Sequence, residues 1–104
     1  MFIAYEVGLE LVRTLRPIAE AIKQHDRELF DQITRAGSSV LLNLGEGNGR
    51  SGKDRKRFFR YAKGSVSEIK AVIDVAEAWG WDIDTRAARA IVGRLDALLW
   101  GLIR

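Results

Sequence analysis

The chain has 104 residues, of which 47% are hydrophobic and 30% charged, and its formal net charge is +3. This length fits a single domain, residues 1–104, with a small core. No apolar run approaches the roughly 20 residues of a membrane span, no basic region opens the chain as in a signal peptide, and the lack of cysteine excludes disulfide frameworks and thiolate metal sites. We therefore expect a cytoplasmic protein.

Apolar residues recur with a helical period along the whole chain, and no segment alternates as a half-buried strand does. The first helix is predicted from about Phe2 to Gln24. Its apolar stripe consists of Val7, Leu11, Leu15, Ile18 and Ile22. Pro17 lies inside this stripe and has no amide hydrogen to donate, which predicts a kink or a split near Leu15–Arg16.

The second helix is predicted to begin after Asp26, a good N-cap residue. Its apolar face consists of Leu29, Ile33, Ala36, Val40 and Leu44. The glycines between Gly45 and Gly52 are expected to end this helix, because glycine is a poor helix former.

The third helix is predicted from about Lys53–Asp54 to Trp79, where Gly80 fits the C′ position and Trp81 the hydrophobic position after it. Its apolar seam is expected to consist of Phe58, Ala62, Ser65, Ile69, Val72, Ala76 and Trp79.

Thr85 is a plausible N-cap for the fourth helix. The apolar face of that helix consists of Ala88, Ile91, Leu95, Leu98, Leu99 and Leu102. The predicted fold class is therefore all-α, an antiparallel up-down four-helix bundle with short connections.

The second and third helices run antiparallel around a loop near Arg50, so facing residues should have numbers that sum to about 100. This register places small residues opposite each other, which predicts close backbone packing of Ala36 and Gly37 against Gly64 and Ser65. It also predicts two polar clamps between the helices. These are Gln32 and Arg35 near Glu68, and Asn43 and Glu46 near Arg57.

Residues Gly47 to Lys53 match the phosphate-loop signature G-x-x-x-x-G-K. A true P-loop lies between a strand and a helix, and its lysine is followed by Ser or Thr. Here a helical pattern precedes the glycines and Asp54 follows the lysine, so we interpret the run as a helix-to-helix turn. A nucleotide-hydrolysing enzyme is the third-ranked hypothesis, and it would require activity that disappears with Lys53→Ala.

Positive charge is concentrated around this turn. Residues 45–63 contain seven basic and two acidic residues, a local charge of +5, whereas the rest of the chain contains ten basic and twelve acidic residues, or −2. The candidate nucleic-acid-binding residues, called the basic patch below, are Arg50, Lys53, Lys56, Arg57, Arg60 and Lys63. Those on the third helix share one arc opposite the seam, whereas Arg55 points nearer the apolar side.

No acid other than Asp54 lies between Glu46 and Glu68, so we expect nothing local to neutralise the basic patch. Lys and Arg contacts to phosphates would be sensitive to salt and largely independent of base sequence. A solvated helix face remains the alternative interpretation. Phe59 and Tyr61 flank the patch and are able to stack on bases, although packing is the expected role of both.

No catalytic constellation is evident, because the single histidine, His25, lies at a helix boundary without a catalytic or metal-binding partner. We expect no cofactor, no metal and no enzymatic activity. Three tryptophans are many for a small domain, and an exposed one would fit a subunit interface.

One set of motifs spans most of the chain. It consists of Gln32-x-x-Arg35-Ala36-x-x-Ser39-Val40-x-x-Asn43-Leu44-x-Glu46-Gly47, then Gly49-Arg50, Lys53-Asp54, Arg57-Phe58, Ala62-x-Gly64-Ser65, Glu68 and Trp79-Gly80-Trp81. This pattern resembles the four-helix-bundle family first noted in proteins encoded by intervening sequences of bacterial 23S ribosomal RNA genes. That family includes the accessory variability proteins of diversity-generating retroelements. The chain departs from it upstream, where Pro17 lies inside a long first helix rather than in a short loop.

The resemblance implies a homopentameric ring or barrel of bundles and no known enzymatic activity. For the retroelement branch it also implies a basic surface that binds nucleic acid and a reverse transcriptase partner. Both branches share the motifs, so the sequence leaves the choice between them open. The leading hypothesis is a non-enzymatic oligomeric accessory protein that binds RNA or DNA, and the alternative is a structural or protein-interaction bundle.

Overall fold

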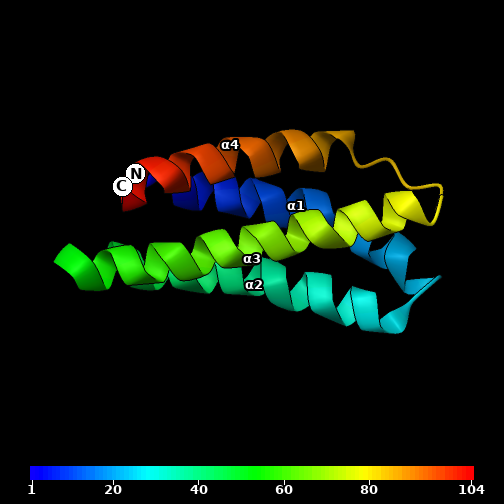
Figure 1. Cartoon of the computed structure of the whole chain (residues 1–104), viewed down its shortest axis with the longest axis horizontal. Helices are drawn as coiled ribbons and strands as arrows, with labels where there is room; N and C mark the ends of the chain where they lie inside the picture. The colour runs from blue at the N-terminus through cyan, green and yellow to red at the C-terminus, as the bar shows by residue number, and fades with distance from the viewer.

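The computed structural model describes residues 1–104 as four antiparallel helices in an up-down arrangement (Figure 1), as predicted. The helices are α1 (Ile3–Lys23), α2 (Arg27–Asn48), α3 (Gly52–Ala78) and α4 (Arg86–Ile103), and no residue is in a strand. The bundle measures 42 × 22 × 21 Å. Both termini lie at the end of the bundle that carries the α2–α3 turn. None of the four helices combines the length and apolarity that a membrane crossing requires.

Helix α1 continues through Pro17, so of the predicted kink or split near Leu15–Arg16 the split does not occur. Pro17 lies on the exposed surface, whereas Leu15 and Ile18 on either side of it are buried. Packing of the apolar stripe on both sides of the proline holds the helix together, because helical stability in proteins comes mainly from tertiary burial.

Helix α2 begins as predicted, since the carboxylate of Asp26 accepts a hydrogen bond from the amide of Leu29 at 3.0 Å. The helix ends later than its glycines suggest, at Asn48, and only residues 49–51 connect it to α3. Gly47 is therefore helical and lies in α2, while Lys53 lies in the first turn of α3. No strand precedes the run, so the interpretation as a helix-to-helix connection is confirmed.

The end of α3 has the predicted glycine cap. Gly80 has a φ of +75°, which a residue with a side chain rarely adopts. The amide of Trp81 donates to the carbonyl of Ala76 at 3.2 Å, and the amide of Gly80 donates to the carbonyl of Glu77 at 3.0 Å. This pair of hydrogen bonds is the Schellman motif, which satisfies carbonyls left free at a helix end.

The start of α4 is placed correctly but capped differently. Thr85 precedes the helix as predicted, yet its side chain makes no capping hydrogen bond and is buried instead. The amide of Arg86 donates to the carboxylate of Asp84 at 3.1 Å. Asp84 therefore takes the capping role that was expected of Thr85.

The core contains one stripe from each helix, and the stripe of α3 differs from the prediction. Phe58 and Ser65 are only half-buried, and Trp79 is 71% exposed. The buried residues of α3 are Phe59, Ala62, Val66, Ile69, Val72, Ile73 and Ala76. The predicted seam was thus displaced by one residue at two places, from Phe58 to Phe59 and from Ser65 to Val66, because a periodic pattern alone does not choose between adjacent positions.

The register of α2 against α3 is close to the prediction. The side-chain amide of Gln32 donates to Glu68 at 3.4 Å, and these two numbers sum to 100. The hydroxyl of Ser65 donates to that of Ser39 at 2.9 Å, and these numbers sum to 104, within one turn of the predicted register. The clamp at Gln32 and Glu68 is therefore confirmed, although Arg35 makes no ion pair in it.

The second predicted clamp does not form. Asn43 donates to the carbonyl of Ser39 at 2.9 Å, within its own helix. Glu46 pairs with Arg50, and Arg57 pairs with Asp54. Both arginines therefore form ion pairs with acids that are near in sequence. Side chains three or four residues apart on one helix are neighbours whatever the tertiary structure.

The prediction of close packing at Gly37 and Gly64 was also wrong. A Cβ atom on Gly37 would lie 3.6 Å from Val12 of α1, an ordinary contact, and a Cβ atom on Gly64 would meet nothing within 4 Å. The tight approach is instead at Gly47, where a Cβ atom would lie 2.7 Å from the ring of Phe59. Gly47 is therefore the position at which the α2–α3 packing requires glycine.

Candidate nucleic-acid interface

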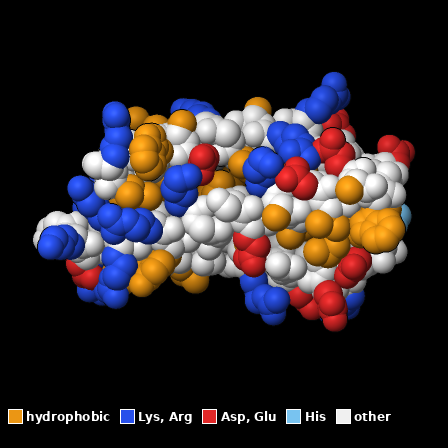
Figure 2. Space-filling model, in the orientation of Figure 1, with side chains coloured by type: hydrophobic (Ala, Val, Ile, Leu, Met, Phe, Trp, Pro, Cys, Tyr) orange, Lys and Arg blue, Asp and Glu red, His pale blue; other side chains and the backbone are white.

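The basic patch lies at the end of the bundle where α2 turns into α3. Arg50 is in the turn, and the other five residues lie within the first twelve residues of α3. Lys and Arg side chains crowd this end, whereas Asp and Glu side chains become more frequent toward the opposite end (Figure 2). The fold thus preserves the charge asymmetry of the sequence as an asymmetry between the two ends.

Three of the six residues of the basic patch are paired with acids. Arg50 contacts Glu46 at 2.5 Å and Asp54 at 2.9 Å. Arg57 contacts Asp54 at 2.6 Å. The third pair joins two helices, since Lys63 of α3 contacts Asp96 of α4 at 2.6 Å. The expectation that nothing local neutralises the patch was therefore wrong for half of its members.

The other three residues, Lys53, Lys56 and Arg60, make no ion pair. Lys53 and Arg60 are exposed and Lys56 is half-buried. Seven basic residues of segment 45–63 face three acids, Glu46, Asp54 and the added Asp96, so the region keeps a charge of +4. Three of these four charges, on Lys53, Lys56 and Arg60, lie on the outer arc of α3, and the fourth is on Arg55.

Arg55 has a structural role, as its predicted position near the apolar side suggests. Its guanidinium lies 5.8 Å from the ring centre of Phe2 and 5.0 Å from that of Phe59. The two rings contact each other with centres 5.6 Å apart, and Phe59 is fully buried. Arg55 therefore covers the end of the core, and the predicted packing role of Phe59 is confirmed.

The paired arginines surround Phe58. The guanidinium of Arg50 lies 5.1 Å and that of Arg57 4.9 Å from the centre of its ring. Asp54 bridges the two arginines. This arrangement orders the start of α3, since cation–π contacts and ion pairs both restrict the arginine side chains. Two of the six basic residues of the patch therefore have a structural role.

The ion pairs shift the affected pKa values in the expected directions. Hydrogen bonds from Arg57, and then from Arg50, lower the pKa of Asp54 below its usual range. Hydrogen bonds to Glu46, and then to Asp54, raise the pKa of Arg50, and Asp54 raises the pKa of Arg57. Asp54 and both arginines therefore stay ionised at neutral pH, and the two arginines remain paired with Asp54.

We expect Asp54→Asn to lower the melting temperature at neutral pH and to have less effect as the pH approaches 2. Because the pKa of Asp54 is lowered in the folded state, its charged form stabilises the fold above the unfolded pKa of about 3.9. This contribution disappears as the pH falls through the folded pKa. The side chains are exposed, so a change of at most a few degrees is expected.

Thermal unfolding followed by circular dichroism between pH 2 and pH 7 measures this effect. The matched control is Asp82→Asn, because Asp82 is exposed and makes no ion pair. A difference between Asp54→Asn and the original protein that stays constant over this pH range would contradict the assigned role.

One contributor to the site escaped prediction from the sequence. Asp96 is 33 residues from Lys63, and only the pairing of α3 with α4 brings the two together. The antiparallel register of α3 and α4 would have predicted this contact. Arg89 of α4 reaches Asp74 of α3 in the same register, at 2.9 Å.

The single histidine lies away from the basic patch. His25 is exposed and stacks on Trp81, with ring centres 4.6 Å apart, at the end opposite the basic patch. No group of three or more His, Cys, Asp or Glu side chains is placed to hold a metal ion.

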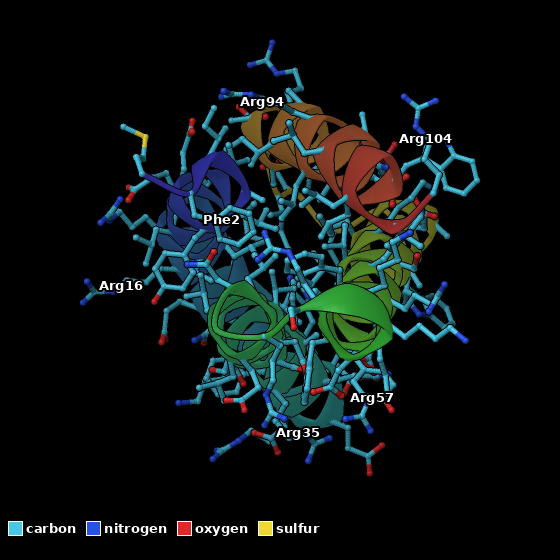
Figure 3. The ribbon with its side chains drawn as sticks, turned by 90° about the vertical axis from the view of Figure 1, so that its left-hand side faces the viewer. Phe2, Arg16, Arg35, Arg57, Arg94 and Arg104 are labelled. Carbon is cyan, nitrogen blue, oxygen red and sulfur yellow. The ribbon has the colours of Figure 1, made fainter.

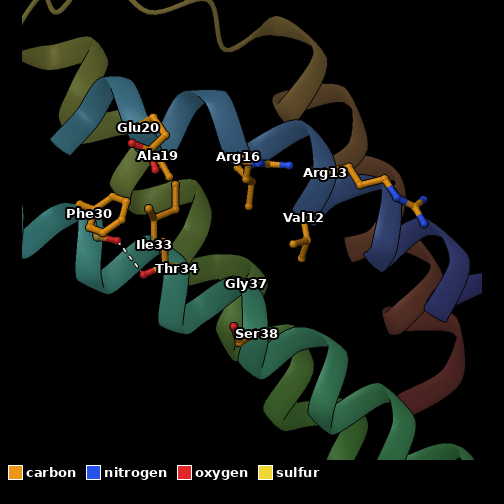
Figure 4. A pocket seen from close by; sticks show the side chains of 11 residues that line it. Val12, Arg13, Arg16, Ala19, Glu20, Phe30, Ile33, Thr34, Gly37 and Ser38 are labelled. Carbon is orange, nitrogen blue, oxygen red and sulfur yellow. Dashed lines mark hydrogen bonds between the residues drawn. The ribbon is translucent and has the colours of Figure 1, made fainter. Parts of the chain in front are cut away.

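A groove of about 350 Å³ lies between α1 and α2, away from the basic patch (Figure 4). Val12, Ala19 and Ile33 supply apolar walls, and Arg13 and Arg16 lie at the α1 side. Glu20, Thr34 and Ser38 also line the groove, and the Thr34 hydroxyl donates within α2 to the carbonyl of Phe30 at 2.9 Å (Figure 4).

The comparison with protein families agrees with the resemblance seen in the motifs. The model of the 23S rRNA-intervening sequence protein family matches residues 2–96. The match includes α1, α2, α3, much of α4 and the whole basic patch. No curated protein matches the chain. The chain belongs to the 23S rRNA-intervening sequence protein family.

Proposed function

We propose that this protein is a non-enzymatic, cytoplasmic accessory protein that binds RNA or DNA by its phosphates through the basic patch. The observation that carries the proposal is the group of three basic residues without an acidic partner, Lys53, Lys56 and Arg60, on one arc of α3. A solvated helix face commonly mixes charges of both signs, whereas this arc is of one sign. Membership of a family named for an rRNA intervening sequence supports an RNA-related role.

The proposal includes assembly into a homo-oligomer, with the pentamer implied by the family resemblance as the specific form. Each added copy would contribute a further set of unpaired cations to one polyanion, which raises avidity without any new kind of contact. Light scattering coupled to size exclusion measures the mass of the assembly. In the retroelement branch the protein would act beside a reverse transcriptase, and a gene for that enzyme next to variable repeats would identify this branch.

We expect the affinity for a generic RNA to fall steeply between low and moderate salt. Binding to a single strand releases counterions, so the logarithm of the binding constant should fall with the logarithm of salt concentration with a slope of roughly −0.7 per neutralised phosphate. Three cations from one copy predict a slope of about −2, and an oligomer predicts a steeper one. Fluorescence anisotropy of a labelled RNA across a salt series measures it.

No retention of RNA or DNA at low salt would contradict the proposal. Recovery of an acidic protein partner in that case would favour the alternative, a protein-interaction bundle whose basic patch binds carboxylates.

A further inference from the structure

Two exposed aromatic side chains lie at the end of the bundle that carries the basic patch. Trp100 of α4 is 57% exposed and Tyr61 of α3 is 51% exposed. The one other exposed aromatic residue, Trp79, lies at the opposite end, where α3 finishes. An exposed aromatic side chain does not gain the free energy of burial in the core. When such a side chain lies beside a charged site, it indicates a binding surface.

The ion pair between Lys63 and Asp96 places Trp100 relative to the unpaired cations. Because α3 and α4 run antiparallel, the residue one turn after Asp96 is level with the residue about one turn before Lys63. Trp100 is therefore level with Arg60, and Lys56 lies one further turn along α3. Hydrophobic side chains are interleaved with Lys and Arg side chains at this end of the molecule (Figure 2).

Tyr61 is held in place by its neighbours on α3. Its ring meets Phe58 edge to face, with centres 5.9 Å apart, and the guanidinium of Arg57 lies 6.0 Å from its centre. These contacts occupy part of the ring and leave half of the residue open to solvent. The network of paired arginines thus orients an aromatic surface beside the unpaired cations.

A surface of cations and exposed aromatic rings suits single-stranded nucleic acid better than a duplex. A duplex stacks its base faces on one another and presents phosphates outward, so it would use only the cations. A single strand presents unstacked bases together with its phosphates, and aromatic side chains stack on those bases whatever their sequence.

We propose that the basic patch selects single-stranded over double-stranded nucleic acid, with bases stacking on Trp100 and Tyr61 while Lys56 and Arg60 contact the phosphates. This inference rests on the proposed function and specifies its ligand. The electrostatic part of the site supplies attraction, and the aromatic part supplies the preference for a single strand.

The test compares a labelled single-stranded RNA with a duplex of the same sequence and length at fixed salt. Trp100→Ala is expected to lower the affinity for the single strand about tenfold and to leave the affinity for the duplex within about twofold. The salt slope should stay unchanged, because no phosphate contact is removed. Trp100→Phe retains a ring and should recover most of the lost affinity.

Trp79→Ala is the matched control, because it removes a tryptophan that is at least as exposed as Trp100 from the opposite end of the bundle. It should bind both RNAs as the original protein does. Circular dichroism and the mass of the assembly are measured for each variant.

Three outcomes overturn the inference. The first is an original protein that binds both RNAs equally well. The second is a Trp100→Ala variant that loses both affinities together with its assembly mass, which would make Trp100 a subunit contact. The third is unchanged binding of both RNAs by Trp100→Ala. Failure of the proposed function itself looks different, since the original protein would then bind neither RNA even at low salt.

Discussion

Replacing Lys53, Lys56 and Arg60 together by glutamate is expected to lower the affinity for RNA about 100-fold or more at low salt. These residues supply three of the four positive charges in segment 45–63 that no acid of the bundle offsets. Reversing them changes the local charge from +4 to −2 and replaces attraction of phosphates by repulsion. The salt slope should also become shallower, because fewer counterions are released on binding.

The control reverses three other unpaired, exposed arginines, Arg13, Arg16 and Arg94. Arg16 and Arg94 project from α1 and α4 on the side away from α3 (Figure 3). The control has the same change in net charge, so it separates a local site from a general dependence on charge. Screening over about 10 Å at 0.1 M salt limits the expected effect of the control to a few-fold.

Anisotropy titrations of both triple variants against one RNA decide the result. Equal losses of affinity in the two variants would show that overall charge, rather than the basic patch, attracts the RNA. Binding by the patch variant that matches the original protein would exclude the patch as the site.

Gly47→Ala is expected to destabilise the fold more than any other alanine replacement of a helical glycine in this chain. The added Cβ atom would lie 2.7 Å from one carbon and 2.9 Å from another carbon of the buried ring of Phe59. Over-packing of this kind costs about 1–3 kcal/mol. For a domain of this size each kcal/mol corresponds to about 4–8 °C, so the melting temperature should fall by about 5–20 °C.

Gly64→Ala is a control with the opposite expected sign. Gly64 is also helical, in α3, and a Cβ atom there would meet nothing within 4 Å. Alanine is a better helix former by up to about 1 kcal/mol, so this variant should melt a few degrees higher. Thermal and urea unfolding of both variants measure the difference.

A double variant tests whether the loss of stability in Gly47→Ala comes from the contact with the Phe59 ring. Adding Phe59→Leu to Gly47→Ala removes the atoms that clash, so the two changes together should cost less than their sum. Additive costs, or a Gly47→Ala variant as stable as the original protein, would show that the contact does not constrain α2 against α3.

The ion pairs separate two kinds of basic residue within one segment. Arg50 and Arg57 share Asp54 and enclose Phe58, so they stabilise the start of α3. The unpaired Lys53 belongs to the same motif set as these two arginines. The residues proposed to bind phosphate are those of the basic patch that form no ion pair.

The number, type and order of the helices could be predicted from the amino-acid sequence alone. Their signals are local, since the cap at Asp26 and the glycine cap at Gly80 act through hydrogen bonds within a few residues. The charge asymmetry is equally local, because the basic residues are close together along one helix. The motif set identified the family, and the match over residues 2–96 confirmed it.

The packing of the bundle settled which residues of these helices meet. It chose Phe59 over Phe58 for the core, placed the tight approach at Gly47 instead of Gly37 and Gly64, and brought Asp96 to Lys63. Such choices depend on distances between helices, whereas a hydrophobic period reports only which side of one helix faces inward. The distinction between paired and unpaired cations, on which the proposed site depends, arises for the same physical reason.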